Sequence, residues 1–173
     1  VAWPAMPRSF DMTTEYAGPV EQVRLAFGNR QYWLARLADS GAADARLDTL
    51  TVADDGSGDV VTTQVLRADQ LPGLVAQFHR GDLSIHREEH WGPIADGQAH
   101  GTVSGAVPGA PVSLDGTASL APTDGGSRLA VTLSVEVRVP LVGGTIESFI
   151  GKALVDLLIA EQRFTTVWIT ENS

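Results

Sequence analysis

One stretch near the end of the chain decides the fold: Leu129–Trp168, LAVTLSVEVRVPLVGGTIESFIGKALVDLLIAEQRFTTVW. In its first part, apolar and mostly polar residues alternate from Leu129 to Val139, which predicts a strand with one buried face. After Gly143-Gly144 the period changes to three or four, which predicts one amphipathic helix from about Thr145 to Thr170, roughly 35 to 40 Å long. The apolar stripe of this helix consists of Ile146, Phe149, Ile150, Ala153, Leu154, Leu157, Leu158, Phe164 and Trp168.

The residues before this stretch carry a series of β patterns separated by turn signals. Asp54–Gly58 and Asp124–Gly126 are the strongest of these turns. Consecutive strands joined by short turns form an antiparallel meander. The segment Gln70–Gly81 fits either a loop or a short helical turn. The predicted strands are Ala45–Ala53, Asp59–Arg67, Leu83–Trp91, Gln98–Val107 and Val112–Leu120.

The first part of the chain predicts one strand and a helical pair. Ser9–Tyr16 alternates with a period of two. Pro19 can begin a helix, and Gly28-Asn29 divides the following apolar pattern into two short helices. The whole order predicts a single α+β domain over residues 6–171, in which a curved antiparallel sheet of about seven strands grips the long C-terminal helix. Residues 1–5 are interpreted as an N-terminal extension or a tag remnant.

Composition limits the classes of function. The chain has 173 residues, a net charge of −9 and no cysteine, so disulfides and cysteine-based metal sites are excluded. Nucleic acid binding needs a basic surface, and twelve basic against twenty-one acidic residues do not indicate one. No apolar run reaches the roughly 18 to 20 residues that span a bilayer, and no signal peptide is visible, so we expect a cytoplasmic protein without membrane insertion.

This order of elements resembles the helix-grip fold of the START-like (SRPBCC) superfamily, which includes Bet v 1 allergens, START lipid-transfer domains and polyketide cyclases. More narrowly, the chain resembles an actinobacterial family, the domain of unknown function 2505. Three segments carry that resemblance: Pro7-Arg8-Ser9-Phe10-Asp11, Val137–Phe149 (VRVPLVGGTIESF) and Glu161-Gln162-Arg163-Phe164 through Trp168. The resemblance spans Met6–Glu171. It implies a cavity between sheet and helix that holds a lipid, an isoprenoid or a polyketide-like molecule.

The inward residues of sheet and helix either interdigitate into a solid core or stand apart and line such a cavity. Small strand residues leave unfilled volume, which favours a cavity, although they also serve strand curvature. Gly101, Gly105, Gly116 and Ala118 are of this kind. The predicted ligand-binding residues are Phe10, Met12, Ile85, Trp91, Val103, Leu133, Val135, Phe149, Ala153, Leu154, Leu157, Leu158, Glu161 and Phe164.

Three charged residues lie on or near apolar faces. Glu161 falls near the helix stripe, where it is either a polar anchor or proton acceptor inside the cavity, or reaches solvent or an arginine from the stripe edge. Arg87 and Glu89 share a strand face with Ile85 and Trp91, and either pair or mark the polar mouth of a cavity. Burying any of them without a partner would be costly. These three are the candidate acid–base residues.

The opposite face of the same strand carries His86, Glu88 and His90, with His100 on the next strand. Two imidazoles and a carboxylate are a possible zinc set. Since the apolar residues alternate with them, we interpret this face as exposed to solvent and predict no metal. Tyr16 and Tyr32 either direct their hydroxyls at a ligand or lie in the core with satisfied hydroxyls.

No nucleophile elbow, phosphate-binding loop or dinucleotide fingerprint is present in the sequence. The first hypothesis is therefore a non-enzymatic domain, without a cofactor, that binds or carries an apolar small molecule. A second is an enzyme similar to polyketide cyclases that uses Glu161, Arg87, Glu89 or the histidines. A third is a protein-interaction module, either a monomer or a homodimer paired through a strand edge.

Overall fold

The computed structural model describes residues 8–70, 73, 81–139, 141 and 143–172, apart from the side chains of Gln70 and Phe149. The predicted extension at residues 1–5 and most of the segment 70–81, for which a loop and a short helical turn were both open, lie outside this range. In chain order the elements are β1 (Arg8–Tyr16), α1 (Val20–Phe27), α2 (Arg30–Ala38), β2 (Asp44–Val52), β3 (Gly58–Leu66), the short η1 (Ala68–Gln70), β4 (Leu83–Trp91), β5 (Ala99–Ala106), β6 (Val112–Thr123), β7 (Gly126–Val137) and α4 (Gly143–Glu171).

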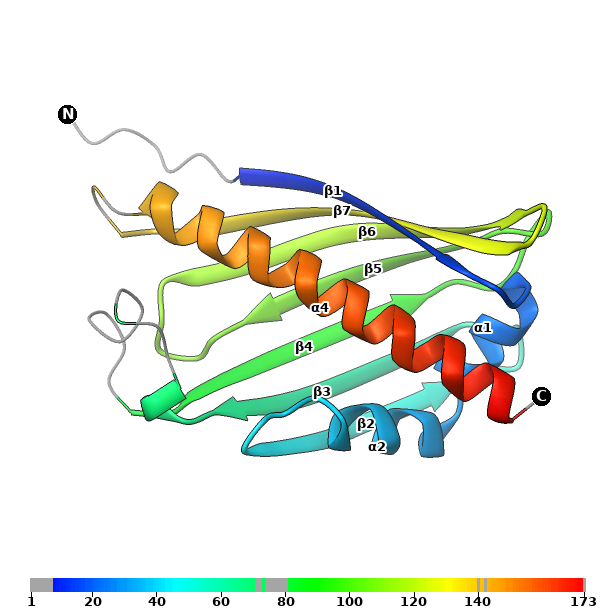
Figure 1. The fold of residues 1–173 in the computed structure, drawn as a ribbon, viewed down its shortest axis with the longest axis horizontal. Coiled ribbons are helices and arrows are strands. Elements are labelled where there is room, and N and C mark those ends of the chain that lie inside the picture. The colour runs from blue at the N-terminus through cyan, green and yellow to red at the C-terminus, as the bar shows by residue number, and fades with distance from the viewer. Residues whose placement is uncertain (1–7, 71–72, 74–80, 140, 142, 173) are drawn as a thin grey trace.

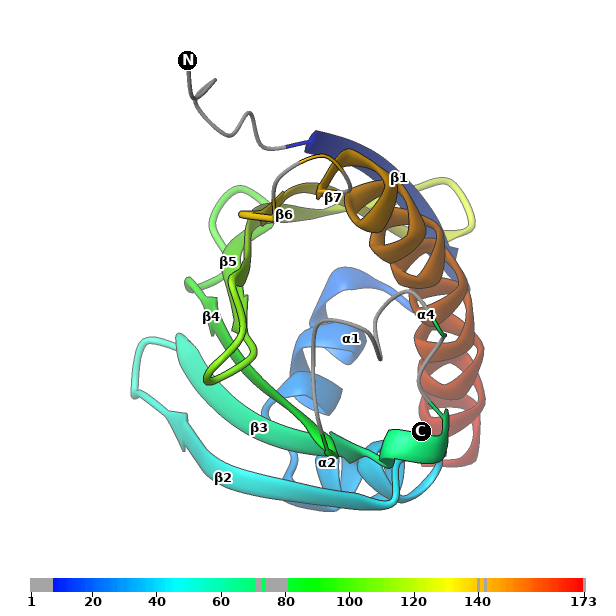
Figure 2. The same cartoon turned by 90° about the vertical axis from the view of Figure 1, so that its left-hand side faces the viewer.

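The seven strands form one antiparallel sheet in the order β1-β7-β6-β5-β4-β3-β2. Figure 1 shows α4 running diagonally across the sheet. Seen along the sheet in Figure 2, the strands curl into an open-sided barrel, and α4 lies along the open side between the edge strands β1 and β2. The predicted α+β helix-grip architecture is confirmed, and α4 is one uninterrupted helix of 29 residues. Within the described residues, no helix is both long and apolar enough to cross a membrane.

Two separate apolar clusters hold the ends of α4. The helix-start cluster joins Ile146 and Ile150 to Phe10, Val135 and Val137 of the sheet. The helix-end cluster is largely aromatic, and the ring of Tyr32 lies 5.8 Å from those of both Phe164 and Trp168. Leu154 and Leu158, in the middle of α4, pack against these clusters and also line the cavity described below.

The short helices begin as their sequence predicts. Asn29 caps α2, since its side-chain oxygen accepts hydrogen bonds from the backbone N–H groups of Gln31 and Tyr32 at 2.8 and 3.3 Å. Arg24 of α1 donates to the backbone oxygens of Gly56 and Gly92, at 2.6 and 3.1 Å. These bonds tie α1 to two strand turns and fix the closed end of the barrel.

Two of the small strand residues do not leave open space. The ring of Trp91 covers Gly101, where an added Cβ would lie 2.8 Å from Cδ2 of the tryptophan. In the same way the side chain of Leu133 covers Gly116. The expectation that these two glycines contribute free volume is wrong, because neighbouring large side chains on the same face lean over them. Gly105 and Ala118 do face open volume.

The helix approaches β1 closely at Gly151. The Phe10 ring occupies the space that a Cβ of residue 151 would need. We expect Gly151→Ala to lower the free energy of unfolding, because overpacking costs about 1 to 3 kcal/mol, more than the roughly 1 kcal/mol that alanine gains in helix propensity. Urea denaturation measures the change. Gly144→Ala is the matched control, since Gly144 is exposed in the first turn of α4, and it should leave stability unchanged or slightly raised. Equal stabilisation by both alanines would contradict the contact.

Candidate functional site

A cavity of about 190 Å³ lies between the sheet and the middle of α4. An apolar cavity of about 150 Å³ already admits a molecule the size of benzene. Its sheet wall includes Met12, Val103, Leu114, Val131 and Leu133. On the other side, the helix contributes Leu154, Leu157, Leu158, Glu161 and Thr165. The cavity is therefore mostly apolar with a polar group at one side, which is typical of small-molecule sites.

The structure places most of the predicted ligand-binding residues in the wall of this cavity. They are Met12, Ile85, Trp91, Val103, Leu133, Leu154, Leu157, Leu158 and Glu161. Their role in binding stays a prediction.

The other members of the predicted set are placed elsewhere, and the structure corrects them. Phe10 and Val135 belong to the helix-start cluster, because the start of α4 packs directly on β1 and β7. Phe164 belongs to the helix-end cluster. Ala153 is exposed, since α4 turns its neighbour Leu154 toward the sheet. The side chain of Phe149 is outside the described residues.

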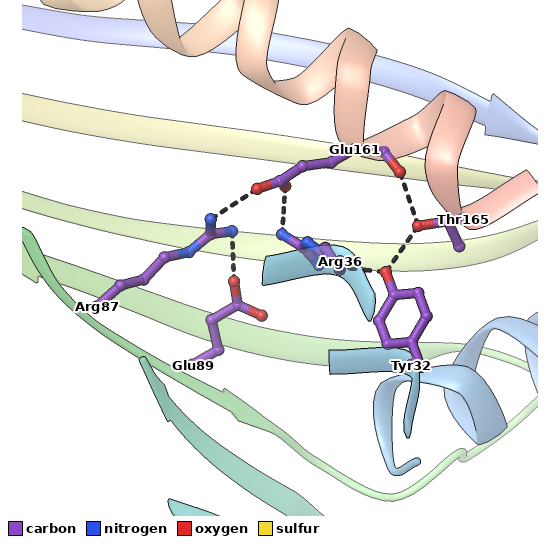
Figure 3. Close-up of polar contacts among 6 residues, drawn as sticks. All are labelled: Tyr32, Arg36, Arg87, Glu89, Glu161 and Thr165. Carbon is purple, nitrogen blue, oxygen red and sulfur yellow. Dashed lines mark hydrogen bonds and ion pairs between the residues drawn. The ribbon is translucent and has the colours of Figure 1, made fainter. Parts of the chain in front are cut away.

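Glu161 lies at the centre of a buried ion-pair network. Its Oε1 atom accepts a hydrogen bond from Arg87 at 2.8 Å, and its Oε2 atom lies 2.5 Å from a terminal nitrogen of Arg36. Arg87 also pairs with Glu89. Figure 3 shows the two guanidinium groups reaching the same carboxylate from β4 and from α2. The side chain of Glu161 is 17% exposed and that of Arg36 10%, so water screens these pairs little.

A chain of hydrogen bonds extends the network into the core. The hydroxyl of Thr165 donates to the backbone oxygen of Glu161 at 2.7 Å, one turn earlier in α4. That leaves the Thr165 oxygen to accept from the Tyr32 hydroxyl at 2.7 Å, and the Tyr32 oxygen in turn accepts from Arg36 at 3.2 Å (Figure 3). Every polar group in this series of hydrogen bonds has a partner, as a stable buried polar network requires.

The network fixes the charge state of Glu161. Burial raises the pKa of its carboxyl, but Arg36 and Arg87 outweigh burial and lower the pKa to about 2. Glu161 is therefore a carboxylate at neutral pH whose oxygens are both engaged by arginines. Such a group stabilises the fold and orients its neighbours, but it is a weak proton acceptor.

The second tyrosine on the inner face, Tyr16, lines the cavity and is 5% exposed. The hydroxyl of Tyr16, unlike that of Tyr32, makes no hydrogen bond with any described residue. Sequence reasoning singled out both tyrosines without deciding between ligand contact and core. Both belong to the helix-end cluster, but the hydroxyl of Tyr32 is satisfied, whereas Tyr16 also lines the cavity.

The histidine face lies outside. His86, Glu88 and His90 have side chains that are 42%, 58% and 53% exposed, and His90 pairs with Asp59 of β3 at 2.6 Å. In the part of the chain that the structure describes, no group of three histidine or acidic side chains is placed to share a metal ion.

Sequence reasoning missed Arg36. It lies on α2, far from Glu161 in the sequence, and no periodicity links the two. The available signal was indirect: a carboxylate on an apolar stripe needs a cation, and the basic residues of the chain are few.

Comparison with known proteins gives the following matches. The family model described as "Protein of unknown function (DUF2505)" matches residues 11–169. The "Uncharacterized protein Rv0481c" of Mycobacterium tuberculosis is 49% identical over 173 residues, which covers 96% of this chain and 99% of that protein.

Two solved structures show a similar fold at low identity. TTHA0849 from Thermus thermophilus matches with a TM-score of 0.61 and 14% identity, covering 96% of this chain and 99% of that one. A START superfamily protein from Mycobacterium smegmatis matches with a TM-score of 0.53 and 14% identity, covering 95% and 99%.

The pKa of Glu161 predicts a pH dependence of stability. Because the pKa is about 2 in the folded protein and ordinarily 4.5, the stabilisation is fully present above pH 4.5 and is lost as the pH falls toward 2. We expect Glu161→Gln to lower the free energy of unfolding at pH 7 by about 3 kcal/mol or more. The difference from the wild type should shrink steadily as the pH falls from about 4.5 toward 2 in urea titrations.

Glu15→Gln is the matched control, since Glu15 forms one ion pair with Arg128 and its side chain is 63% exposed. It should change stability by no more than about 1 kcal/mol at any pH. A Glu161→Gln difference that does not depend on pH would show that the carboxylate is not held by the two arginines.

Proposed function

Since the chain belongs to the DUF2505 family and has the helix-grip fold of START and Bet v 1 proteins, we propose that it binds and carries an apolar small molecule beneath α4. Lipids, isoprenoids and polyketide-like compounds are the classes that suit such a fold. The observation that carries the proposal is the mostly apolar cavity of about 190 Å³ in the domain.

The position of the cavity supports this proposal. It lies between the two clusters that hold α4, so its wall is built by residues that are already fixed in place. Transfer of apolar surface out of water contributes about 25 cal/mol per Å², so a ligand that covers this wall gains affinity without rearranging the fold.

A polyketide cyclase-like enzyme is the alternative. Its support is that Arg87, Glu89 and Glu161 all lie in the cavity wall. Against it stands the chemistry of Glu161, whose pKa is lowered to about 2 and whose oxygens are both engaged. General base catalysis near neutral pH needs a group with a pKa close to the working pH. Binding without catalysis is therefore the better supported function. The cytoplasmic location and the pairing of two chains through a strand edge stay predictions from the sequence.

Filling the cavity tests the proposal. In the sheet, Gly105 is paired with Arg87 and Leu114 and faces the cavity, and an added Cβ there meets Leu114 only at ordinary contact distances, 3.6 Å and beyond. Gly105→Leu should weaken binding of the neutral fluorescent probe N-phenyl-1-naphthylamine at least about tenfold, because the new side chain takes the space of the probe. Probe fluorescence in a titration measures the affinity.

Ala106→Leu is the matched control, since successive strand residues point to opposite faces and Ala106 is exposed. It should leave probe binding unchanged, and urea denaturation should show that both variants fold. No uptake of the probe by the wild type, or equal uptake by both variants, would remove the cavity as a binding site.

A further inference from the structure

The hydroxyl of Tyr16 is a buried polar group without a protein partner among the described residues. Tyr16 ends β1, and its side chain is 5% exposed. Among the described residues, the one fully enclosed polar side-chain atom without a hydrogen bond is Nε of Arg24. The Tyr16 oxygen is therefore not sealed by protein atoms, although it makes no hydrogen bond with a described residue. We place it toward the cavity, because Tyr16 lines the cavity and the wall residues Arg36, Glu89 and Glu161 act electrostatically on this hydroxyl.

This hydroxyl is held in its protonated form. Burial raises its pKa well above the ordinary value of 10, and the charges of Glu161 and Glu89 act in the same direction. Arg36, which opposes this effect, does not outweigh them. Tyr16 is therefore an O–H donor at any pH at which the protein is studied. A donor of this kind is satisfied by an oxygen acceptor of the ligand.

The charges around the cavity decide which acceptor is favoured. Two arginines, Arg36 and Arg87, are matched by two carboxylates, Glu89 and Glu161, and each arginine is engaged by at least one of them. A carboxylate ligand would bring an extra negative charge into a largely desolvated site that is already balanced, and the two glutamates would repel it. An uncharged oxygen carries no such cost.

We infer that the cavity takes an uncharged apolar molecule with an oxygen acceptor, such as a ketone or ester carbonyl, and that the Tyr16 hydroxyl donates a hydrogen bond to this oxygen. The inference rests on the proposed function and narrows it: free fatty acids are disfavoured, and neutral carbonyl compounds are favoured. Tyr16 sets this preference, while the apolar wall supplies most of the affinity.

Three nine-carbon probes test the inference by displacing N-phenyl-1-naphthylamine from the wild type at pH 8. On the wild type, 2-nonanone should bind at least about tenfold more tightly than nonanoate, which carries the charge. Nonane, which lacks the acceptor, serves as the reference for the contribution of Tyr16. In Tyr16→Phe the affinity for 2-nonanone should fall about 3- to 10-fold, the value of one neutral hydrogen bond, while the affinity for nonane stays the same.

Thr14→Val is the matched control, because it removes a hydroxyl from the same strand at a residue that does not line the cavity. It should leave all three affinities unchanged. The comparison of 2-nonanone with nonanoate on the wild type holds even if Tyr16→Phe is less stable.

The outcomes separate the inference from the proposed function. If Tyr16→Phe leaves the affinity for 2-nonanone unchanged, or weakens nonane and 2-nonanone alike, the role of Tyr16 is overturned and apolar binding stands. If nonanoate binds most tightly, the preference for an uncharged ligand is overturned. If no probe displaces the fluorophore, the inference and the proposed function fail together.

Discussion

The rest of the structure depends on one constraint: apolar clusters fix α4 at both of its ends, and the ion pairs of Glu161 with Arg36 and Arg87 hold its middle across a cavity. At the start of the helix, Gly151 admits the Phe10 ring, and Ile146 and Ile150 pack on β7. At the end, Phe164 and Trp168 pack on Tyr32 of α2. A continuous helix cannot bend sharply without a proline, a bulge or an inserted group. The two ends therefore fix the distance between the middle of α4 and the curved sheet (Figures 1 and 2), and the cavity lies between them.

The same geometry explains why charged residues are tolerated in this cavity. The middle of α4 carries Glu161 inward, where an unpaired carboxylate would cost several kcal/mol. Arg36 and Arg87 reach it from two other elements, and Glu89 balances the second arginine. The network therefore joins α2, β4 and α4 across large separations in the sequence. Its bonds need all three elements in place at once, so it favours one arrangement of them over others.

Much of the fold and part of the site could be predicted from the sequence, because the apolar residues of strands and helices recur with characteristic periods. The alternation in Leu83–Trp91 correctly placed Arg87 and Glu89 inward and the histidines outward. The helix stripe correctly brought Glu161 near the apolar face. Periodicity does not encode contacts between distant elements, so it could not show that Arg36 meets Glu161. Periodicity also could not show that the side chains of Trp91 and Leu133 cover Gly101 and Gly116. The rotamers of these two side chains depend on the residues packed around them.

The ion pairs also set the size of the cavity. Arg36, Gln64, Arg87, Leu157 and Glu161 line both the cavity and a second space of about 80 Å³, which lies between α2 and α4 beside Trp33 and Phe164. The paired side chains form the partition between the two spaces. Apolar side chains could form this partition only by filling its space, because their contacts have no preferred direction. Charged pairs fix both the distance and the direction between their groups. The volume open to a ligand thus depends on electrostatic pairing as well as on packing, and the residues that fix it are those least able to act as free acids or bases.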